Sequence, residues 1–295
     1  MPDIALRFNK DMLTLSTPVQ NALARQGVDV DADLEYQLLM EPEAIVDALR
    51  LEAAAGAQCL VVPTEGITAA RLSHKRMEGK AHDLSHAACV CANEVKPQHV
   101  IAAIGPSGLP IDPSSKASLN ENRAQYADAA RAFQGEAFDA FLLDGFTRKE
   151  DLMCALMGLA QVGDTSVLAS VVVDSDGVTP RGDTIEDMCA LMQEYGAGVV
   201  GFSTSAAPVV AAKLVRRAAS ACSLPILVQL NVREVNPRQF EATDQNPYYR
   251  SDEMVTAAAH LHAAGAQFIR AIGAATPSYT GAIAATTGGL DVRLS

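Results

Sequence analysis

The sequence predicts a single closed (β/α)8 barrel, a TIM barrel, that spans residues 1–295 as one domain. Three observations lead to this prediction. A helix–glycine–strand unit recurs, since Ala-Gly-Ala-Gln occurs at 55–58 and at 264–267, each time before a short apolar run, and residues 196–205 repeat the pattern. Such repeated steps from helix to strand build a parallel sheet covered by helices. The length of 295 residues also suits this fold, because barrels use about 250 residues as one domain.

Eight short apolar runs are the expected strands. They are Ile4–Phe8, Cys59–Pro63, Val100–Ile104, Ala140–Leu143, Ser166–Val173, Val199–Phe202, Ile226–Leu230 and Phe268–Ile272. An open, doubly wound sheet is the alternative arrangement for alternating strands and helices. The closed barrel is preferred because no glycine-rich dinucleotide fingerprint follows the first run.

Segments with helical period lie between most of these runs. An apolar stripe over residues 45–49 follows Pro42, and proline suits the first turn of a helix. A second stripe runs over residues 84–95, and a third helical segment, 206–221, begins near Pro208. The segment 251–264 ends at Gly265, where a left-handed residue favours a helix terminus.

The composition excludes several classes of partner. A formal net charge of −12 and a pI near 4.9 make nucleic acid and an anionic membrane surface poor partners, because both repel an acidic protein. Aromatic residues form only 5% of the chain, so a base-stacking surface is not expected. Residues 1–10 lack the long apolar core of a signal peptide, and no run approaches the roughly 18 apolar residues of a membrane span. We therefore expect a cytoplasmic protein.

Cysteine and histidine positions do not favour a metal site. The six cysteines are scattered without a Cys-x-x-Cys pair, so buried free thiols are expected. By spacing, His82, His86 and Cys89 share one helical face and are a local candidate for metal ligands. That helix should lie outside the barrel and has no obvious fourth ligand, so a solvated helix face is preferred.

Polar residues at the carboxyl ends of the expected strands should meet at one mouth of the barrel, where barrel enzymes place their chemistry. Gln229 and Arg270 are the most informative, because a polar residue inside an apolar strand costs burial free energy unless it is paired. Arg270 and Arg233 would then bind a carboxylate or phosphate through their planar guanidinium groups. In the structural alternative, Arg270 only pairs with Asp144 or Asp174. The candidates are Asn9, Thr64, Glu65, Ser107, Asp144, Asp174, Ser203, Thr204, Gln229, Asn231, Arg233 and Arg270.

Seven stretches, taken in order, resemble the homocysteine S-methyltransferase family over nearly the whole chain. The resemblance implies a (β/α)8 barrel that transfers methyl groups to the thiol of homocysteine, in one-carbon metabolism. Each stretch alone is a weak motif, whereas their order and spacing together are fairly specific. They cover residues 38–58, 69–89, 102–113 (AAIGPSGLPIDP), 138–156 (FDAFLLDGFTRKEDLMCAL), 168–183, 196–208 and 224–231.

The resemblance also implies a zinc ion, bound by three cysteines, that keeps the substrate thiol as a thiolate. In the family one cysteine ends a Gly-x-Asn-Cys motif after strand six, and two stand in Gly-Gly-Cys-Cys-Gly-Thr after strand eight. Here Thr204 stands at the first position, and Ile272 and Gly273 stand at the paired positions. These residues do not replace three thiolates, so we expect no zinc and predict no other cofactor.

Other family motifs at the mouth are partly kept. The strand-one Asp-Gly motif reads Asn9-Lys10, and Thr64 ends the segment that aligns with the Thr-Asn-Thr motif of strand two. Asp144 keeps the acidic residue after strand four, and Asn231 keeps the asparagine of the Pro-Asn motif. The scaffold is therefore retained while the metal chemistry is not.

The leading hypothesis is a divergent, zinc-independent methyltransferase that acts on a small acceptor, a thiol or another group. Its partners would be a small-molecule substrate and a methyl donor, with a corrinoid or other methyl-carrier protein among the candidate donors. Asp144, Arg270 and Thr204 are its predicted catalytic residues. The predicted substrate-binding residues are Asn9, Thr64, Glu65, Asp174, Ser203, Gln229, Asn231 and Arg233.

Two alternatives stay open. The first is a catalytically silent barrel that binds a small anionic ligand or partners another methyltransferase subunit, and it follows from the same lost cysteines. The second is a barrel lyase or isomerase with Asp144 or Asp174 as general base and Arg270 as oxyanion partner, which no motif supports.

Overall fold

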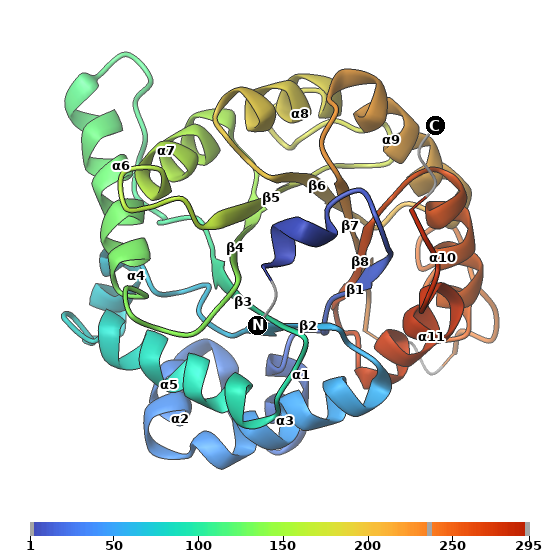
Figure 1. Ribbon diagram of the computed structural model, residues 1–295, viewed down its shortest axis with the longest axis horizontal. Helices are drawn as coiled ribbons and strands as arrows, with labels where there is room; N and C mark the ends of the chain where they lie inside the picture. Colours follow the sequence, from blue (N-terminus) through green and yellow to red (C-terminus); the bar gives the residue numbers. More distant parts are fainter. Residues whose placement is uncertain (1–2, 235–237, 293–295) are drawn as a thin grey trace.

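Eight parallel strands form the barrel in a computed structural model, which describes residues 3–234 and 238–292 (Figure 1). The strands pair in the order β1-β8-β7-β6-β5-β4-β3-β2, and an isolated parallel bridge from Leu15 to Cys59 brings β1 beside β2. The ring is thereby nearly closed, which confirms the predicted barrel. The strands are β1 (Leu13–Thr14), β2 (Cys59–Val62), β3 (His99–Ile104), β4 (Ala140–Phe146), β5 (Ser166–Val172), β6 (Val199–Thr204), β7 (Ile226–Val232) and β8 (Phe268–Gly273).

Helices surround the barrel (Figure 1). As expected, Pro42 and Pro208 are the first residues of two of them, and Gly265 follows a third with φ +96°. Within the described residues, no helix combines the length and the apolar character needed to cross a membrane. The helices are α1 (Gln20–Arg25), α2 (Val30–Met40), α3 (Pro42–Ala55), α4 (Ala69–His74), α5 (Ala81–Glu94), α6 (Lys116–Arg131), α7 (Lys149–Leu159), α8 (Ile185–Glu194), α9 (Pro208–Ala221), α10 (Glu253–Ala263) and α11 (Pro277–Thr287).

The core has two layers because successive strand residues point to opposite faces of the sheet. In β6, for example, Val199 belongs to the cluster inside the barrel, whereas Val200 and Phe202 pack in the cluster between strands and helices. Apolar side chains fill the inner cluster toward the amino ends of the strands, which we call the floor. Polar side chains such as Gln229 and Arg270 follow toward the carboxyl ends, which we call the mouth.

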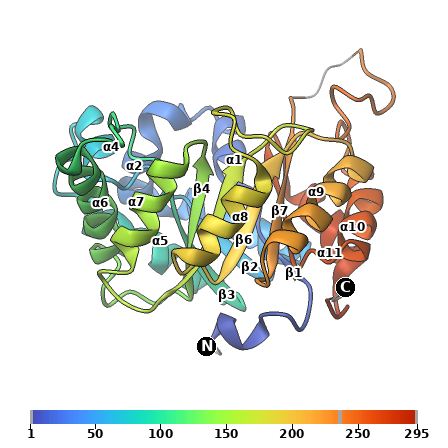
Figure 2. The same cartoon turned by 90° about the horizontal axis from the view of Figure 1, so that it is seen from above.

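The predicted first strand is wrong. Ile4–Arg7 forms a short 3-10 helix, η1, whose amino end is capped by the Asp3 carboxylate accepting from Ala5 N. Figure 2 shows this helix at the floor, below the strands. Ile4 is fully buried there against the inner cluster, so the apolar run closes the end of the barrel instead of entering the sheet. A run this short does not reveal its period, and the true strand, β1, begins at Leu13.

Candidate functional site

A cavity of about 530 Å³ lies at the mouth of the barrel. Its wall includes Glu65 after β2, Asp144 in β4, Ser203 in β6, Asn231 in β7 and Arg270 in β8. All five are among the residues that the sequence predicted for the site. They converge because parallel strands end at the same edge of a closed sheet.

Arg270 is the centre of a buried polar network in this wall. Its side chain is 1% exposed, Nε donates to Ser16 O at 2.9 Å, and Nη1 donates to Asp144 Oδ2 at 3.0 Å. Nη1 also donates to Gln229 Oε1 at 3.1 Å. Within the described part of the chain, Nη2 has no hydrogen-bond partner, and Arg270 lines the cavity. One guanidinium nitrogen therefore keeps its donors for a ligand.

Gln229 ties the network together. The register of β7 and β8 sets it opposite Arg270, and both side chains point into the barrel. Its Nε2 donates to Asp144 Oδ1 at 2.7 Å and to Ser170 Oγ at 2.9 Å. The predicted pairing of Arg270 with Asp144 is thus confirmed, and the pair lies at the mouth, where it satisfies the charge of a buried arginine.

Glu65 brings a second carboxyl group to the cavity. It is half-buried and accepts a hydrogen bond from Gln20 Nε2 at 3.2 Å. Burial raises the pKa of the Glu65 carboxyl above its usual value, the positive charge of Arg270 opposes that rise, and the negative charge of Asp144 adds to it. Glu65 therefore holds a proton more readily than a solvent-exposed glutamate does.

Thr204 and Thr64 do not line the cavity. Both are buried, and their hydroxyl groups serve the backbone: Thr204 Oγ1 accepts from Ala206 N at 3.2 Å, and Thr64 Oγ1 donates to Ala103 O at 2.8 Å. The period of a strand explains the first case, because Ser203 points into the barrel and its neighbour must point toward the helices. Thr204 is therefore placed for a structural contact, unlike its predicted catalytic position.

Four further candidates lie away from the cavity. Asn9 is at the floor, where its N donates to Gln267 Oε1 at 2.8 Å, because the segment before it is not a strand. Asp174 is exposed, and its Oδ1 accepts hydrogen bonds from the backbone N of residues 176 and 178, so its side chain stabilises the turn that follows it.

Arg233 is exposed beyond β7 and does not line the cavity, so the predicted pair of arginines is not formed and only Arg270 of the two faces the cavity. Ser107 is buried and donates to Asn122 Oδ1 at 3.2 Å, outside the cavity wall.

The histidine and cysteine candidate on α5 does not form one site. His82 and His86 are exposed, and His86 Nδ1 lies 3.1 Å from a carboxylate oxygen of Glu136. Cys89 is 1% exposed and packs in the core. Within the described residues, no three histidine, cysteine or acidic side chains are grouped so as to hold a metal ion.

The mouth does not suit a zinc–thiolate centre. None of the six cysteines lines the cavity, whereas Ile272 and Gly273 do. Gly273 has φ +69°, and a Cβ atom there would lie 2.2 Å from Asn231 Oδ1 and 2.4 Å from Val232 O. Asn231 thus occupies the space that a side chain at residue 273 would need. The donor set lacks thiolates, and the backbone at Gly273 has no room for one.

Two polar side chains of the cavity wall, those of Gln20 and Arg71, were not predicted from the sequence. Gln20, at the start of α1, holds Glu65, and its buried Oε1 has no hydrogen-bond partner within the described residues. Arg71, on the short helix α4, is exposed, and its Nε donates to Pro106 O at 3.1 Å. Gln20 was not predicted because the first strand was placed too early in the chain, and Arg71 because it lies on a helix, whereas the predicted mouth residues all lie in or just after expected strands.

Comparisons with known proteins agree with the barrel fold and identify a family. The sequence model described as homocysteine S-methyltransferase matches residues 14–286. The metallated form of the homocysteine methyltransferase MmuM from Escherichia coli is 18% identical, with a TM-score of 0.76 over 93% of this chain and 96% of that chain. Its oxidized form is 17% identical, with a TM-score of 0.77 over the same shares. The carboxyl transferase domain of Rhizobium etli pyruvate carboxylase, in its Y628A variant with pyruvate, is 12% identical, with a TM-score of 0.57 over 95% of this chain and 44% of that chain. No curated protein matches the sequence.

Proposed function

The chain belongs to the homocysteine S-methyltransferase family, and on that premise we propose that it transfers a methyl group to a small, proton-bearing acceptor at the mouth without a zinc–thiolate centre. One observation carries the proposal. The buried guanidinium of Arg270 keeps Nη2 available at a cavity whose wall also holds Glu65, a carboxyl group with a raised pKa. An anion-binding group and a proton acceptor therefore share one cavity.

In this proposal Arg270 and Asn231 bind the methyl acceptor and orient it in the cavity. Because Arg270 is fixed by Ser16 and Asp144, its free nitrogen presents donors in a set direction to a negative group of the acceptor. Asn231 lines the same wall and keeps its place through Nδ2, which donates to Ser205 Oγ at 3.3 Å. Such rigid donors hold a small acceptor in one orientation, which is the first requirement for methyl transfer.

In this proposal Glu65 removes the proton from the methyl acceptor. A thiol has a pKa of about 8.5 and attacks as the thiolate, so it must lose a proton before or during transfer. A carboxyl group whose pKa is raised toward the working pH is a better general base than an ordinary one. In this proposal the acceptor's lone pair forms a bond to the methyl carbon, the bond from that carbon to the donor breaks, and the acceptor's proton passes to Glu65. The donor is a small molecule or a corrinoid or other methyl-carrier protein.

The test measures metal content and turnover together. The purified chain is dialysed with and without homocysteine and analysed for zinc, and small thiols and amines are then offered with sulfonium and corrinoid methyl donors. We expect methylated product, far less than one zinc per chain, and no effect of a chelator. Glu65→Gln should lower kcat by about a hundredfold or more while acceptor binding persists. One retained zinc per chain with chelator-sensitive turnover would contradict the proposal, as would no product from any pair.

A silent anion-binding barrel is the second candidate, because the lost cysteines remove the family's usual means of activating a thiol. The variant Arg270→Ala distinguishes the silent anion-binding barrel from the methyltransferase. A binding protein should chiefly lose affinity for a small carboxylate, measured by calorimetry, whereas a transferase should chiefly lose turnover. Wild-type protein that binds the carboxylate tightly and methylates none of the acceptors would favour the silent barrel.

A further inference from the structure

We infer that Glu52, a buried residue of α3 that does not line the mouth cavity, is a positioning residue that fixes the guanidinium of Arg270 through the Ser16–Thr17 peptide group. The inference deepens the proposed function and rests on it, since there Arg270 orients the acceptor. Nothing in the sequence pattern had drawn attention to Glu52.

The geometry forms a continuous chain from one charge to the other. Glu52 is 2% exposed, and its Oε2 accepts from Thr17 N at 3.0 Å. The carbonyl of the same peptide group, Ser16 O, accepts from Arg270 Nε at 2.9 Å. A single peptide unit therefore has a carboxylate at its N–H end and a guanidinium at its C=O end.

This arrangement strengthens both hydrogen bonds. The carboxylate draws the N–H toward itself and so increases the negative charge on the carbonyl oxygen, which makes the oxygen a better acceptor for the arginine. Charge-assisted bonds of this kind are stronger than neutral ones. Because Nε is held by Ser16 and Nη1 by Asp144, the plane of the guanidinium is set, and Nη2 is the nitrogen left for the cavity.

The position of Glu52 is costly unless it serves such a purpose. It continues the buried stripe of α3 that includes Ile45 and Leu49, where an apolar side chain would pack without desolvating a charge. Instead both carboxylate oxygens of Glu52 accept hydrogen bonds. Thr17 donates through its N and Oγ1, and Thr280 Oγ1 donates to Oε2 at 2.5 Å. Burial raises the pKa of the Glu52 carboxyl, whereas the two threonines and the charge of Arg270 oppose the rise.

The test reads the Arg270 Nε–H directly by NMR of protein labelled with 15N-arginine, with Arg270→Lys to assign the signal. Glu52→Gln keeps the size of the side chain and removes its charge. We expect the Arg270 Nε proton to move upfield and to exchange with water about three- to tenfold faster, the change expected from one weakened hydrogen bond. With a working acceptor, the same variant should raise KM more than it lowers kcat.

Glu35→Gln is the matched control. Glu35 on α2 is also a buried glutamate, 7% exposed, but it pairs with Lys75 and does not touch the Ser16–Thr17 peptide. We expect the Arg270 signal of this variant to equal that of the wild type. An unchanged signal in Glu52→Gln, or an equal change in both variants, would overturn the inference. If Glu52→Gln does not fold, Glu52→Asp takes its place, because it keeps the charge but shortens the reach of the side chain. The Arg270 Nε proton of this variant should likewise move upfield and exchange faster than in the wild type. No turnover by the wild-type chain would overturn only the proposed function, because the Nε–H measurement needs no turnover.

Discussion

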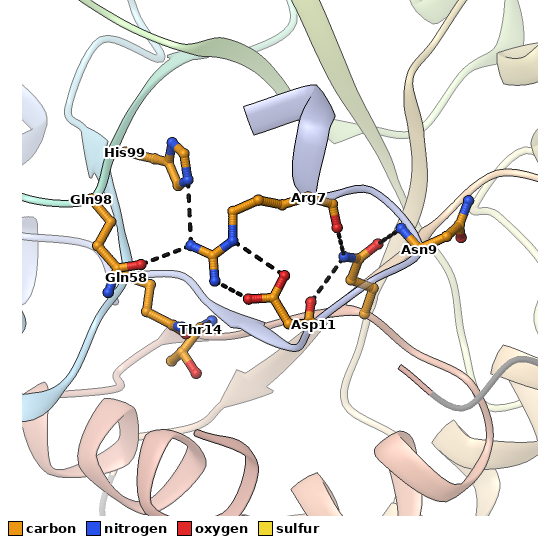
Figure 3. Close-up of polar contacts among 8 residues, drawn as sticks. Arg7, Asn9, Asp11, Thr14, Gln58, Gln98 and His99 are labelled. Atoms are coloured by element: carbon orange, nitrogen blue, oxygen red, sulfur yellow. Dashed lines mark hydrogen bonds and ion pairs between the residues drawn. The ribbon is translucent and has the colours of Figure 1, made fainter. Parts of the chain in front are cut away.

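The floor and the mouth of the barrel each hold one arginine in a polar cluster, and the two arginines differ in how completely they are used. At the floor, Arg7 contacts Asp11 through Nε and Nη2, and its Nη1 donates to Gln98 Oε1 at 2.7 Å and lies 3.5 Å from His99 Nε2 (Figure 3). At the mouth, Arg270 leaves Nη2 without a partner among the described residues. A polar cluster in which every guanidinium nitrogen has a contact closes the barrel, whereas one with a spare guanidinium nitrogen beside a cavity can bind a ligand.

The carboxyl groups of the two ends show the same contrast. Hydrogen bonding to Arg7 lowers the pKa of Asp11 at the floor, whereas burial raises the pKa of Glu65 at the mouth. The floor thus stabilises a charged pair, and the mouth keeps a carboxyl group that can exchange a proton.

The largest effect is expected at the Arg270–Asp144 pair. Asp144→Ala leaves a guanidinium that is 1% exposed without its carboxylate, which should lower the free energy of unfolding by about 3–5 kcal/mol. The floor counterpart, Asp11→Ala, breaks a pair whose side chains are 20% and 33% exposed, and it should cost about 1 kcal/mol or less. Denaturant unfolding of both variants measures the difference, and equal losses would remove the distinction between the two ends.

The next effect tests whether the family's metal site can return at the mouth. Gly273→Cys places a Cβ atom 2.2 Å from Asn231 Oδ1 at φ +69°, and it should cost about 2 kcal/mol of unfolding free energy without creating zinc binding. Gly196→Cys, before β6 on the floor side, has φ +86° and nothing within 4 Å of its Cβ, so it should cost less. A well-folded Gly273→Cys protein that binds zinc would show that the mouth does have room for a thiolate at residue 273.

A smaller effect is expected for Arg7 itself. Arg7→Ala removes partly exposed contacts of the floor, so unfolding free energy should fall by about 1 kcal/mol while carboxylate binding at the mouth stays at the wild-type level. Calorimetry with a small carboxylate and denaturant unfolding of the same sample measure the two quantities. Weakened binding in this variant would show that the floor cluster acts on the mouth.

The smallest effect is in the pH dependence of stability. Since the folded-state pKa of Glu65 is raised, its contribution to stability is fully present below its unfolded pKa and is lost as pH rises through the folded pKa. Glu65→Gln should therefore gain stability relative to the wild type as the pH rises above the unfolded-state pKa of a glutamate, about 4.3, and denaturant unfolding at a series of pH values measures this gain.

Asp11 should show the opposite trend. Its folded-state pKa is lowered, so its contribution is present above its unfolded pKa and is lost as pH falls through the folded pKa. The difference in unfolding free energy between the wild type and Asp11→Asn should therefore shrink in acid. Differences with the same sign of slope for both variants would contradict the contrast between the two ends.

Sequence periods were enough to predict the barrel and most of its strands. The seven predicted runs that lie between Cys59 and Ile272 are all strands in the structure, because each is apolar, short and separated from the next by a helical segment. The run Ile4–Phe8 is no shorter than several runs that are strands, but it forms a 3-10 helix with Ile4 packed at the floor, and the error of placing a strand there moved Asn9 to the wrong end of the barrel. The family resemblance, carried by the order of the motifs, was confirmed over residues 14–286.

By itself, the sequence determined the fold class and the family, since these depend on local pattern and residue identity. Only the tertiary structure decided which polar residues share the mouth cavity. Contacts such as Arg270 with Ser16, 254 residues apart, depend on strand register and on which face each residue presents. A shift of one residue turns a side chain from the cavity to the helices, which is why Ser203 lines the cavity and Thr204 does not.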